Sequence, residues 1–233
     1  MDNSKKLSAI LSRHTHAFAP VFAADLNADT VCRLDFTEAN QLLQTIDLRN
    51  TEAFNRAVQL LLLQQGASIG VGGYLENRFI YQRSSHFDVQ AESRNLHLGI
   101  DVWIEAGTPV YTPLNAKVHS FQDNANFGDY GPTLILAHEL EDTLFYTLYG
   151  HLTRTSLEGL HVGKTFSKGE KLAEVGPYPE NGDWPPHLHF QVISDMDGRY
   201  GDFPGVATLT EREKYSEICP NPNLILQSRH LPE

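Results

Sequence analysis

The sequence predicts a mainly β protein, an antiparallel sandwich or barrel with a small N-terminal helical layer. Two observations support this prediction. The chain shows helical periodicity before about residue 70, and short β-type runs separated by glycine and proline after it. Among those runs no helical segment is long enough to connect parallel strands, so the sheet should be mainly antiparallel.

Two helices are expected in the N-terminal part. Asp35 and Glu38 have the spacing of a capping box and open a short helix. A second helix begins near Asn50 or Thr51, where apolar residues recur at helical spacing, and stops at Gly66, in the position that glycine favours after a helix. We interpret this part as an accessory layer without chemistry of its own.

Runs rich in β-branched and aromatic residues follow from Arg78 onward. They are RFIYQR (78–83), LHLGIDVWI (96–104), TPVYT (108–112), AKVHSF (116–121), PTLILAH (132–138), TLFYTLYGH (143–151), KLAEV (171–175) and HLHFQVI (187–193). The fifth and sixth runs, joined across 139–142, predict a hairpin. We therefore divide the chain into a helical and irregular accessory region (1–70), a β domain (71–210) and a C-terminal tail that packs on it (211–233).

Charge and composition exclude several classes of function. Of the 233 residues, 41% are hydrophobic, and 29 acidic residues against 18 basic ones give a net charge of −11. This acidic balance argues against nucleic acid as a partner. No apolar run approaches the ~18 residues of a membrane-spanning helix, so no membrane partner is expected either.

Cysteine usage and the N-terminus bear on the compartment. Cys32 and Cys219 lie far apart and outside any C-x-x-C spacing, which fits two free thiols in a reducing compartment. The apolar stretch from Leu7 to Leu11 is shorter than the ~7–15 residues of a secretory signal. A cytoplasmic protein is expected, or a secreted or periplasmic one if a leader has been removed.

Histidine is abundant, with 11 in the chain, and one run contains H-x-H. A strand there would place His187 and His189 on one face, opposite three apolar residues. Two such imidazoles can reach one ion, or one can bind metal while the other handles a proton. Two surface histidines on an exposed strand are the competing interpretation.

Two further pieces contain histidine. His97 and Asp101 form H-x-x-x-D, and both are ordinary zinc-ligand types, but a bend or bulge at Gly99 is needed to turn them to one spot. An exposed histidine and a turn aspartate are the alternative. His151 follows Gly150 at the end of a strand-like run, where catalytic side chains tend to lie. Taken alone, a core or edge histidine is the better interpretation there.

The order H-x-x-x-D, then Y-G-H-L about fifty residues later, then P-H-L-H-F, resembles the LytM and lysostaphin type of zinc metallopeptidase over about 95–192. The resemblance implies a lysostaphin-like barrel-sandwich hybrid that hydrolyses a peptide bond. It also implies Zn²⁺ as cofactor, with His97, Asp101 and His189 as metal ligands. His151 and His187 correspond to the two histidines of the family that act in catalysis without binding the metal.

This assignment agrees with zinc chemistry. Three protein ligands leave a fourth position for water, whose pKa zinc can lower from 15.7 to about 7. We hypothesise that His187 acts as general base toward this water and that His151 hydrogen-bonds the oxyanion. The two roles could be exchanged.

The peptide substrate is less well defined. The segment 176–186 is longer than the family's usual turn and contains four prolines, so it should wall the substrate groove. Tyr178 and Trp184 either supply apolar contacts there or pin the loop. A second resemblance, from Gly66 to Leu226, is to the metallopeptidase-type domain in bacterial chains beside a kinase-like domain and a class III aminotransferase. The implied substrate is a peptidoglycan-type cross-link or a soluble intracellular peptide, and the acidic charge favours the latter.

Two other classes of function stay open. One is a binding or scaffold domain of the same fold without hydrolysis, although all five site residues are present. The other is a sandwich carrier domain, although no M-K-M motif for a modifiable lysine exists. The oligomeric state is open. His138 is an undecided neighbour of His151. The remaining histidines are interpreted as surface or sheet residues, namely His14, His16, His86, His119, His161 and His230.

Overall fold

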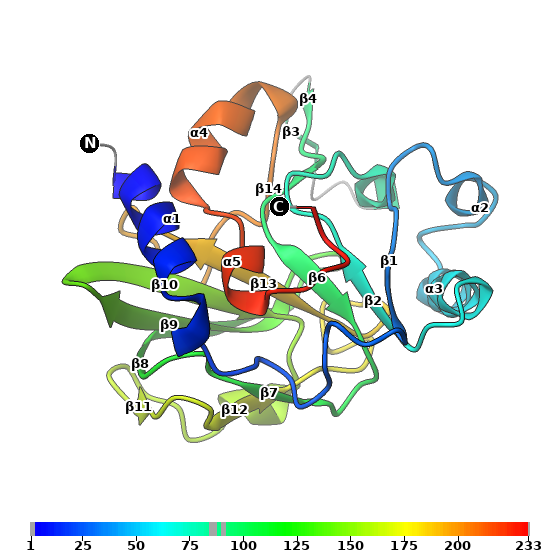
Figure 1. The fold of residues 1–233 in the computed structure, drawn as a ribbon. Coiled ribbons are helices and arrows are strands. Elements are labelled where there is room, and N and C mark those ends of the chain that lie inside the picture. The colour runs from blue at the N-terminus through cyan, green and yellow to red at the C-terminus, as the bar shows by residue number, and fades with distance from the viewer. Residues whose placement is uncertain (1–2, 84–87, 90–91, 233) are drawn as a thin grey trace.

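The computed structural model describes residues 3–83, 88–89 and 92–232. A large sheet dominates the molecule (Figure 1), with eight strands in the order β1-β2-β6-β13-β10-β9-β8-β11. They are β1 (Val31–Arg33), β2 (Ile69–Gly72), β6 (Ile100–Trp103), β8 (Ala116–Asn124), β9 (Gly131–Leu140), β10 (Thr143–Gly150), β11 (Thr165–Phe166) and β13 (His187–Ile193). β1 and β2 are parallel, and the other neighbours in the sheet are antiparallel. The mainly antiparallel β fold is confirmed, as is the hairpin, formed by β9 and β10.

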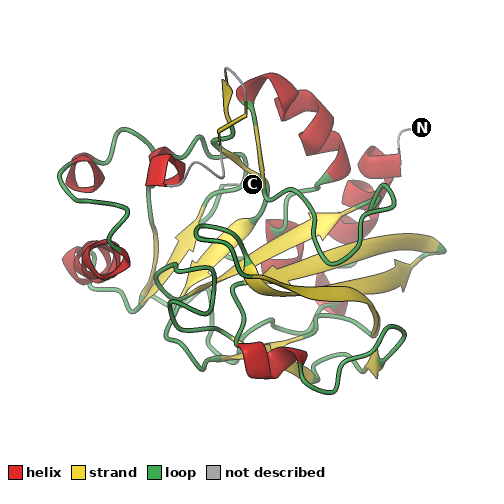
Figure 2. Ribbon diagram, turned by 180° about the vertical axis from the view of Figure 1, so that it is seen from behind, coloured by secondary structure: helices red, strands yellow, loops and turns green. Residues whose placement is uncertain are grey.

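A second layer covers one face of this sheet (Figure 2). It contains β7 (Pro109–Tyr111) paired with β12 (Lys171–Glu174). Val110 and Leu172 of this small sheet share a buried cluster with Leu188 and Phe190 of β13. The two layers therefore form a sandwich whose core contains the apolar face of β13.

Short pairs and helices complete the fold. The other two-stranded sheets are β5 (Leu96–His97) with β14 (Val206–Ala207), and β3 (Asp88–Val89) with β4 (Glu92–Ser93). α1 (Asn3–Arg13) packs against α4 (Arg212–Ile218) and α5 (Asn223–Leu226), so the N-terminal and C-terminal segments lie side by side (Figure 1). No helix in the described part of the chain has the length and apolarity needed to cross a membrane.

The accessory layer lies at the β1 end of the sheet and contains α2 (Gln41–Gln44) and α3 (Thr51–Gln64). Its core contains several aromatic side chains: Phe36, Phe54 and Trp184 share a buried cluster with Trp103 of β6. The ring of Phe36 lies 4.8 Å from that of Trp103. Through Trp103, the accessory layer packs directly on the strand that carries Asp101.

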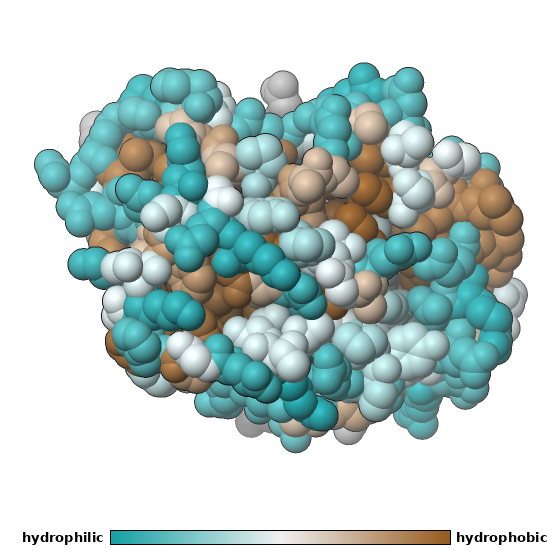
Figure 3. All heavy atoms as spheres, turned by 90° about the horizontal axis from the view of Figure 1, so that it is seen from below, coloured by the Kyte–Doolittle hydropathy of each residue, from teal (hydrophilic) through white to brown (hydrophobic). Residues whose placement is uncertain are grey.

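The prediction for α3 is confirmed. The Asn50 side chain accepts a hydrogen bond from the backbone N–H of Ala53, and Gly66 follows the helix with φ +65°. Only one face of α3 is buried, since Leu60 and Leu63 are 41% and 75% exposed. In Figure 3, hydrophobic residues (brown) gather at the right-hand edge of the molecule, the end at which α3 lies.

The capping box predicted at Asp35 and Glu38 is wrong. The Asp35 carboxylate instead accepts a hydrogen bond from the backbone of Thr37, which forms a local turn. The helix starts later, at Gln41, after an Asn40 whose side chain makes no cap bond. An aspartate side chain can either cap a helix or accept a hydrogen bond from the backbone two residues later. Asp35 does the latter and so forms a turn instead of a helix cap.

The strand predicted at 78–83 is also wrong. Phe79–Arg83 form a 3-10 helix, η2. The adjacent residues Ile80 and Tyr81 are both buried in the aromatic cluster of the accessory layer. Alternating strand geometry would send them to opposite faces, so tertiary packing overrides the β propensity of this run. Helix α1 and the parallel pairing of β1 with β2 were not predicted.

Gly182 provides a test of how tightly the 176–186 loop is seated. A Cβ there would lie 1.9 Å from the Asp129 carbonyl oxygen, whereas at Gly107 nothing lies within 4 Å, and the two φ angles are nearly equal at +84° and +82°. Gly107→Ala should cost about 1–2 kcal/mol for the positive φ. Gly182→Ala should cost about 3 kcal/mol or more because steric overlap adds to that strain. Urea denaturation measures both, and equal losses would show that the loop moves away freely.

Candidate metal centre

Strand pairing and one bend bring His97, Asp101 and His189 together. β13 pairs with β6 in a register that places His189 opposite Asp101. His97 ends β5, and the chain then bends through Gly99 into β6. A Cβ at Gly99 would lie 2.6 Å from Cε1 of His189 and 2.8 Å from the Phe190 carbonyl oxygen. Only glycine fits this approach, so Gly99 is what lets His97 reach the other two side chains.

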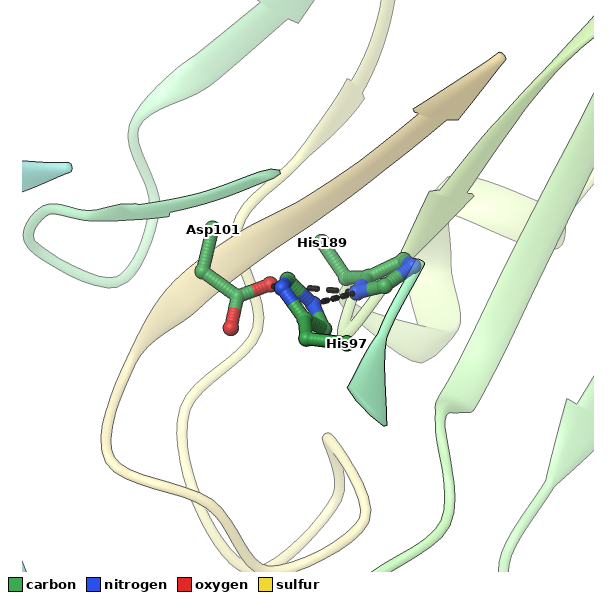
Figure 4. Close-up of side chains that lie close together, drawn as sticks. All are labelled: His97, Asp101 and His189. Carbon is green, nitrogen blue, oxygen red and sulfur yellow. Dashed lines mark hydrogen bonds and ion pairs between the residues drawn. The ribbon is translucent and has the colours of Figure 1, made fainter. Parts of the chain in front are cut away.

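The ligand-type atoms of these three residues converge (Figure 4). His97 Nε2 lies 3.0 Å from His189 Nδ1. Asp101 Oδ1 lies 3.2 Å from His97 Nε2 and 3.1 Å from His189 Nδ1. Each residue is at most 3% exposed. Within the described residues, this is the one group of three or more His, Cys, Asp or Glu whose ligand atoms all lie within 4.8 Å of one another.

Hydrogen bonds on the far side of each imidazole determine its tautomer. His97 Nδ1 donates to the Gly73 carbonyl oxygen over 3.0 Å, so Nε2 carries the lone pair. His189 Nε2 donates to Gln191 Oε1 over 2.9 Å, so Nδ1 carries the lone pair. The Gln191 amide is oriented in turn, because its Nε2 donates to the Pro204 carbonyl oxygen.

Three acceptor atoms therefore face one another without a proton between them. Such a triangle is repulsive by itself and becomes favourable around a cation. Ligand atoms at 2.0–2.1 Å from a tetrahedral zinc ion are about 3.3 Å apart, close to the 3.0–3.2 Å found here. Two neutral imidazoles and a carboxylate are ordinary zinc donors and leave a fourth position open. His97, Asp101 and His189 thus fit a zinc ion.

Protonation favours the same arrangement. Burial, followed by the positive charge of Arg78, lowers the pKa of His97 to about 3. Burial opposes ionisation of Asp101, but the positive charge of Arg78 beside it holds the pKa of the carboxyl well below its ordinary value. At neutral pH the site therefore holds a neutral His97 and an ionised Asp101, the forms that bind metal.

His151 and His187 lie beside this triangle, with ring centroids 4.2 Å apart. Each donates through Nδ1 to a backbone carbonyl at 2.8 Å, that of Asn181 for His151 and that of Pro185 for His187. Both Nε2 atoms are therefore proton acceptors. His187 is also stacked on Trp103, with centroids 4.1 Å apart. Burial lowers the pKa of His187 to about 4 and, with His187 nearby, holds that of His151 well below its ordinary value.

The family model for peptidase family M23 matches residues 95–200, which contain all five of these residues. Residues 95–200 are thus similar to peptidase family M23. This agrees with the LytM and lysostaphin resemblance of the sequence. A search of curated proteins found no match.

Solved structures similar to this chain include three described as peptidases. A zinc-containing peptidase from Vibrio cholerae is 27% identical with a TM-score of 0.33, over 42% of this chain and 27% of that one. A putative peptidase M23 from Pseudomonas aeruginosa is 19% identical with a TM-score of 0.37, over 57% and 44%. The catalytic domain of lysostaphin from Staphylococcus simulans is 20% identical with a TM-score of 0.37, over 54% and 85%. This chain thus spans less than half of the first two proteins.

A cavity of about 150 Å³ lies over the site. Trp184 lines it and donates from Nε1 to the Asp129 carbonyl oxygen, so the 176–186 loop forms a wall as expected. Tyr178 is not among the lining residues. The cavity is also lined by Arg78, Tyr81, Asp101, Trp103, Tyr130, His151, His187 and His189.

Arg78 is the residue that sequence reasoning missed. It is 1% exposed and bonds Asp101 Oδ2. Its position in the run 78–83, which was interpreted as a strand, concealed its contact with Asp101. The available signal was an arginine placed directly before the apolar, aromatic residues of that run.

The other histidines lie outside the cluster. His138 is buried and bonds the Asn115 carbonyl oxygen and Thr147 Oγ1, so it belongs to a polar network between β9 and β10. His86 lies outside the described residues. The histidines with other partners are His14 on Glu141, His119 on Ser120, His161 on Val162 and His230 on Ala28.

The buried His138 should make the free energy of unfolding depend on pH. Burial lowers its pKa to about 4 from 6.5 in an unperturbed residue. Between these values the unfolded chain binds a proton that the folded chain does not, so stability falls as pH falls, by about 3 kcal/mol in total. His138→Gln should remove this contribution, and the exposed His161→Gln should not. Urea denaturation at several pH values from 7 to 4 checks this, and an unchanged pH slope in His138→Gln would contradict it.

Proposed function

We propose that this protein is a zinc-dependent peptidase that hydrolyses a peptide bond. The observation that supports it is the triangle of three acceptor atoms, Nε2 of His97, Oδ1 of Asp101 and Nδ1 of His189, beside two neutral histidines. Zinc held by these three residues supplies Lewis acidity, which lowers the pKa of a water molecule toward about 7 and polarises the substrate carbonyl. The M23 assignment of residues 95–200 agrees with this activity.

His187 is the proposed general base. Its Nδ1–H donates to the Pro185 carbonyl oxygen, which leaves Nε2 to take a proton from the attacking water. Stacking on Trp103 fixes the ring plane, and Nε2 lies 3.8 Å from Asp101 Oδ2, at the edge of the metal site. The proton can then pass to the leaving amine.

His151 is the proposed oxyanion donor. Its neutral tautomer carries the proton on Nδ1, bonded to the Asn181 carbonyl oxygen, so Nε2 has no hydrogen to donate. Stabilising an oxyanion through Nε2 therefore requires a second proton on this ring. The same holds for His187 if the roles are exchanged, since the two rings have equivalent tautomers.

The proposed substrate is a soluble peptide rather than a cell-wall polymer. A net charge of −11 repels an anionic polymer over its whole length but hinders a short peptide little. The cavity of about 150 Å³ has aromatic walls at Tyr81, Tyr130 and Trp184, which suit apolar contacts with a peptide.

Metal content tests the ligand set. The purified protein should bind about one zinc ion per chain, and Asp101→Asn or His189→Ala should abolish stoichiometric binding because each removes a donor. His161→Ala, an exposed histidine, serves as the matched control and should bind as the parent does. Elemental analysis after gel filtration measures this. A folded parent that binds no zinc when zinc is supplied would contradict the proposal.

Activity tests the roles of the other two histidines. His187→Ala and His151→Ala should each lower kcat/KM by about 10²–10⁴ while retaining zinc. Cleavage of a library of L- and D-peptides, compared with cell-wall fragments and with a chelator, supplies the assay. An inactive His187→Ala that has also lost zinc would show that His187 is a ligand. No chelator-sensitive cleavage in any set would favour the binding-domain alternative.

A further inference from the structure

A buried arginine contacts the metal-site carboxylate from behind. Arg78 is 1% exposed, and its Nη1 bonds Oδ2 of Asp101, the oxygen that does not face the two ligand histidines. Nε of the same guanidinium donates to Glu76 Oε2 over 3.0 Å, and Nη1 also lies 3.3 Å from the Tyr81 hydroxyl. Arg78 thus holds one oxygen of Asp101 while the other oxygen belongs to the acceptor triangle.

We propose that Arg78 is a positioning residue that keeps Asp101 a one-oxygen ligand and so preserves the open position of the metal site. This inference rests on the proposed metal site. A carboxylate can bind a metal through one oxygen or two, and the second oxygen would take the place that water needs. With Oδ2 bonded to Arg78, only Oδ1 is available.

The surroundings of Arg78 favour an arginine over a simple positive charge. Glu76 and Tyr81 bond two different nitrogen atoms of the Arg78 guanidinium and so fix its plane. The single nitrogen of a lysine ammonium group could not be oriented in this way. The Phe36 ring lies 5.4 Å from Cζ. At Gly72 a Cβ would lie 2.8 Å from Nη2, so β2 leaves room for the guanidinium only because it has no side chain there.

These contacts also assign a role to the accessory layer. Phe36 covers Arg78 from the segment between β1 and α2, and Arg33 of β1 lies 3.8 Å from Glu76. A buried arginine is tolerated when its charge is paired, and here the carboxylates of Glu76 and Asp101 contact Nε and Nη1 of Arg78. The accessory layer therefore helps to enclose the paired charges of Glu76 and Arg78, and Arg78 in turn orients Asp101.

Cobalt substitution tests the inference, because the intensity of Co²⁺ visible absorption falls as the coordination number rises from four. The parent loaded with Co²⁺ should give intense bands. Arg78→Met keeps the volume of the stem but frees Oδ2, so the absorption should fall several-fold while one Co²⁺ per chain is retained. Arg83→Met is the matched control: Arg83 is 2% exposed but donates to Thr51 and Asp183, and its variant should keep the parent spectrum.

The outcomes separate this inference from the proposed function. A folded parent that binds no Co²⁺ contradicts the metal site itself. A parent with intense bands and an Arg78→Met variant with the same bands overturns only the role of Arg78. If Arg78→Met does not fold, a crystal structure of the zinc-loaded parent decides: one Asp101 oxygen on zinc with Oδ2 on Arg78 supports the inference, and two oxygens on zinc overturn it.

Discussion

The site depends on one pairing, that of β13 with β6, in the register that places His189 opposite Asp101. β13 has an apolar face, including Leu188 and Phe190, that is buried in the sandwich core. A slip by one residue would turn those side chains out of the core and the histidines into it, so hydrophobic burial fixes the polar face as firmly as the apolar one. The geometry of the candidate metal site is therefore a consequence of the packing on the other side of the sheet.

The polar face of β13, which carries two histidines, is itself covered. His187 and His189 are 2% and 3% exposed. Trp103 and the accessory layer cover one end, and the 176–186 loop covers another through Trp184. Covering removes water, strengthens electrostatic interactions and lowers the pKa of His187. The accessory layer thus contributes to the chemistry of the site although it contributes no ligand.

The sequence could predict those parts of the fold and site that depend on local pattern. Alternation in HLHFQVI predicted the two faces of β13, and the helical spacing after Asn50 predicted α3. Those parts of the fold and site that depend on residues far apart in the sequence could not be predicted. Strand β1 is three residues long and owes its existence to pairing with β2, 38 positions along the chain (Val31 with Ile69). Arg78 reaches Asp101 across 23 positions, and no local spacing encodes that contact.

The four histidines of the site have their tautomers determined in the same way. In each of them, the ring nitrogen that points away from the site donates a hydrogen bond to an oxygen atom. Gly73, Asn181 and Pro185 supply backbone carbonyls, and Gln191 supplies its amide oxygen to His189. Two of these carbonyls come from the 176–186 loop, where the Asn181 side chain bonds Gly176 and Trp184 and so holds its own backbone in place. The long, proline-rich 176–186 loop therefore does more than line the cavity. It fixes the carbonyl acceptors that leave a lone pair on Nε2 of both His151 and His187, which couples the shape of the loop to the tautomers of these two rings.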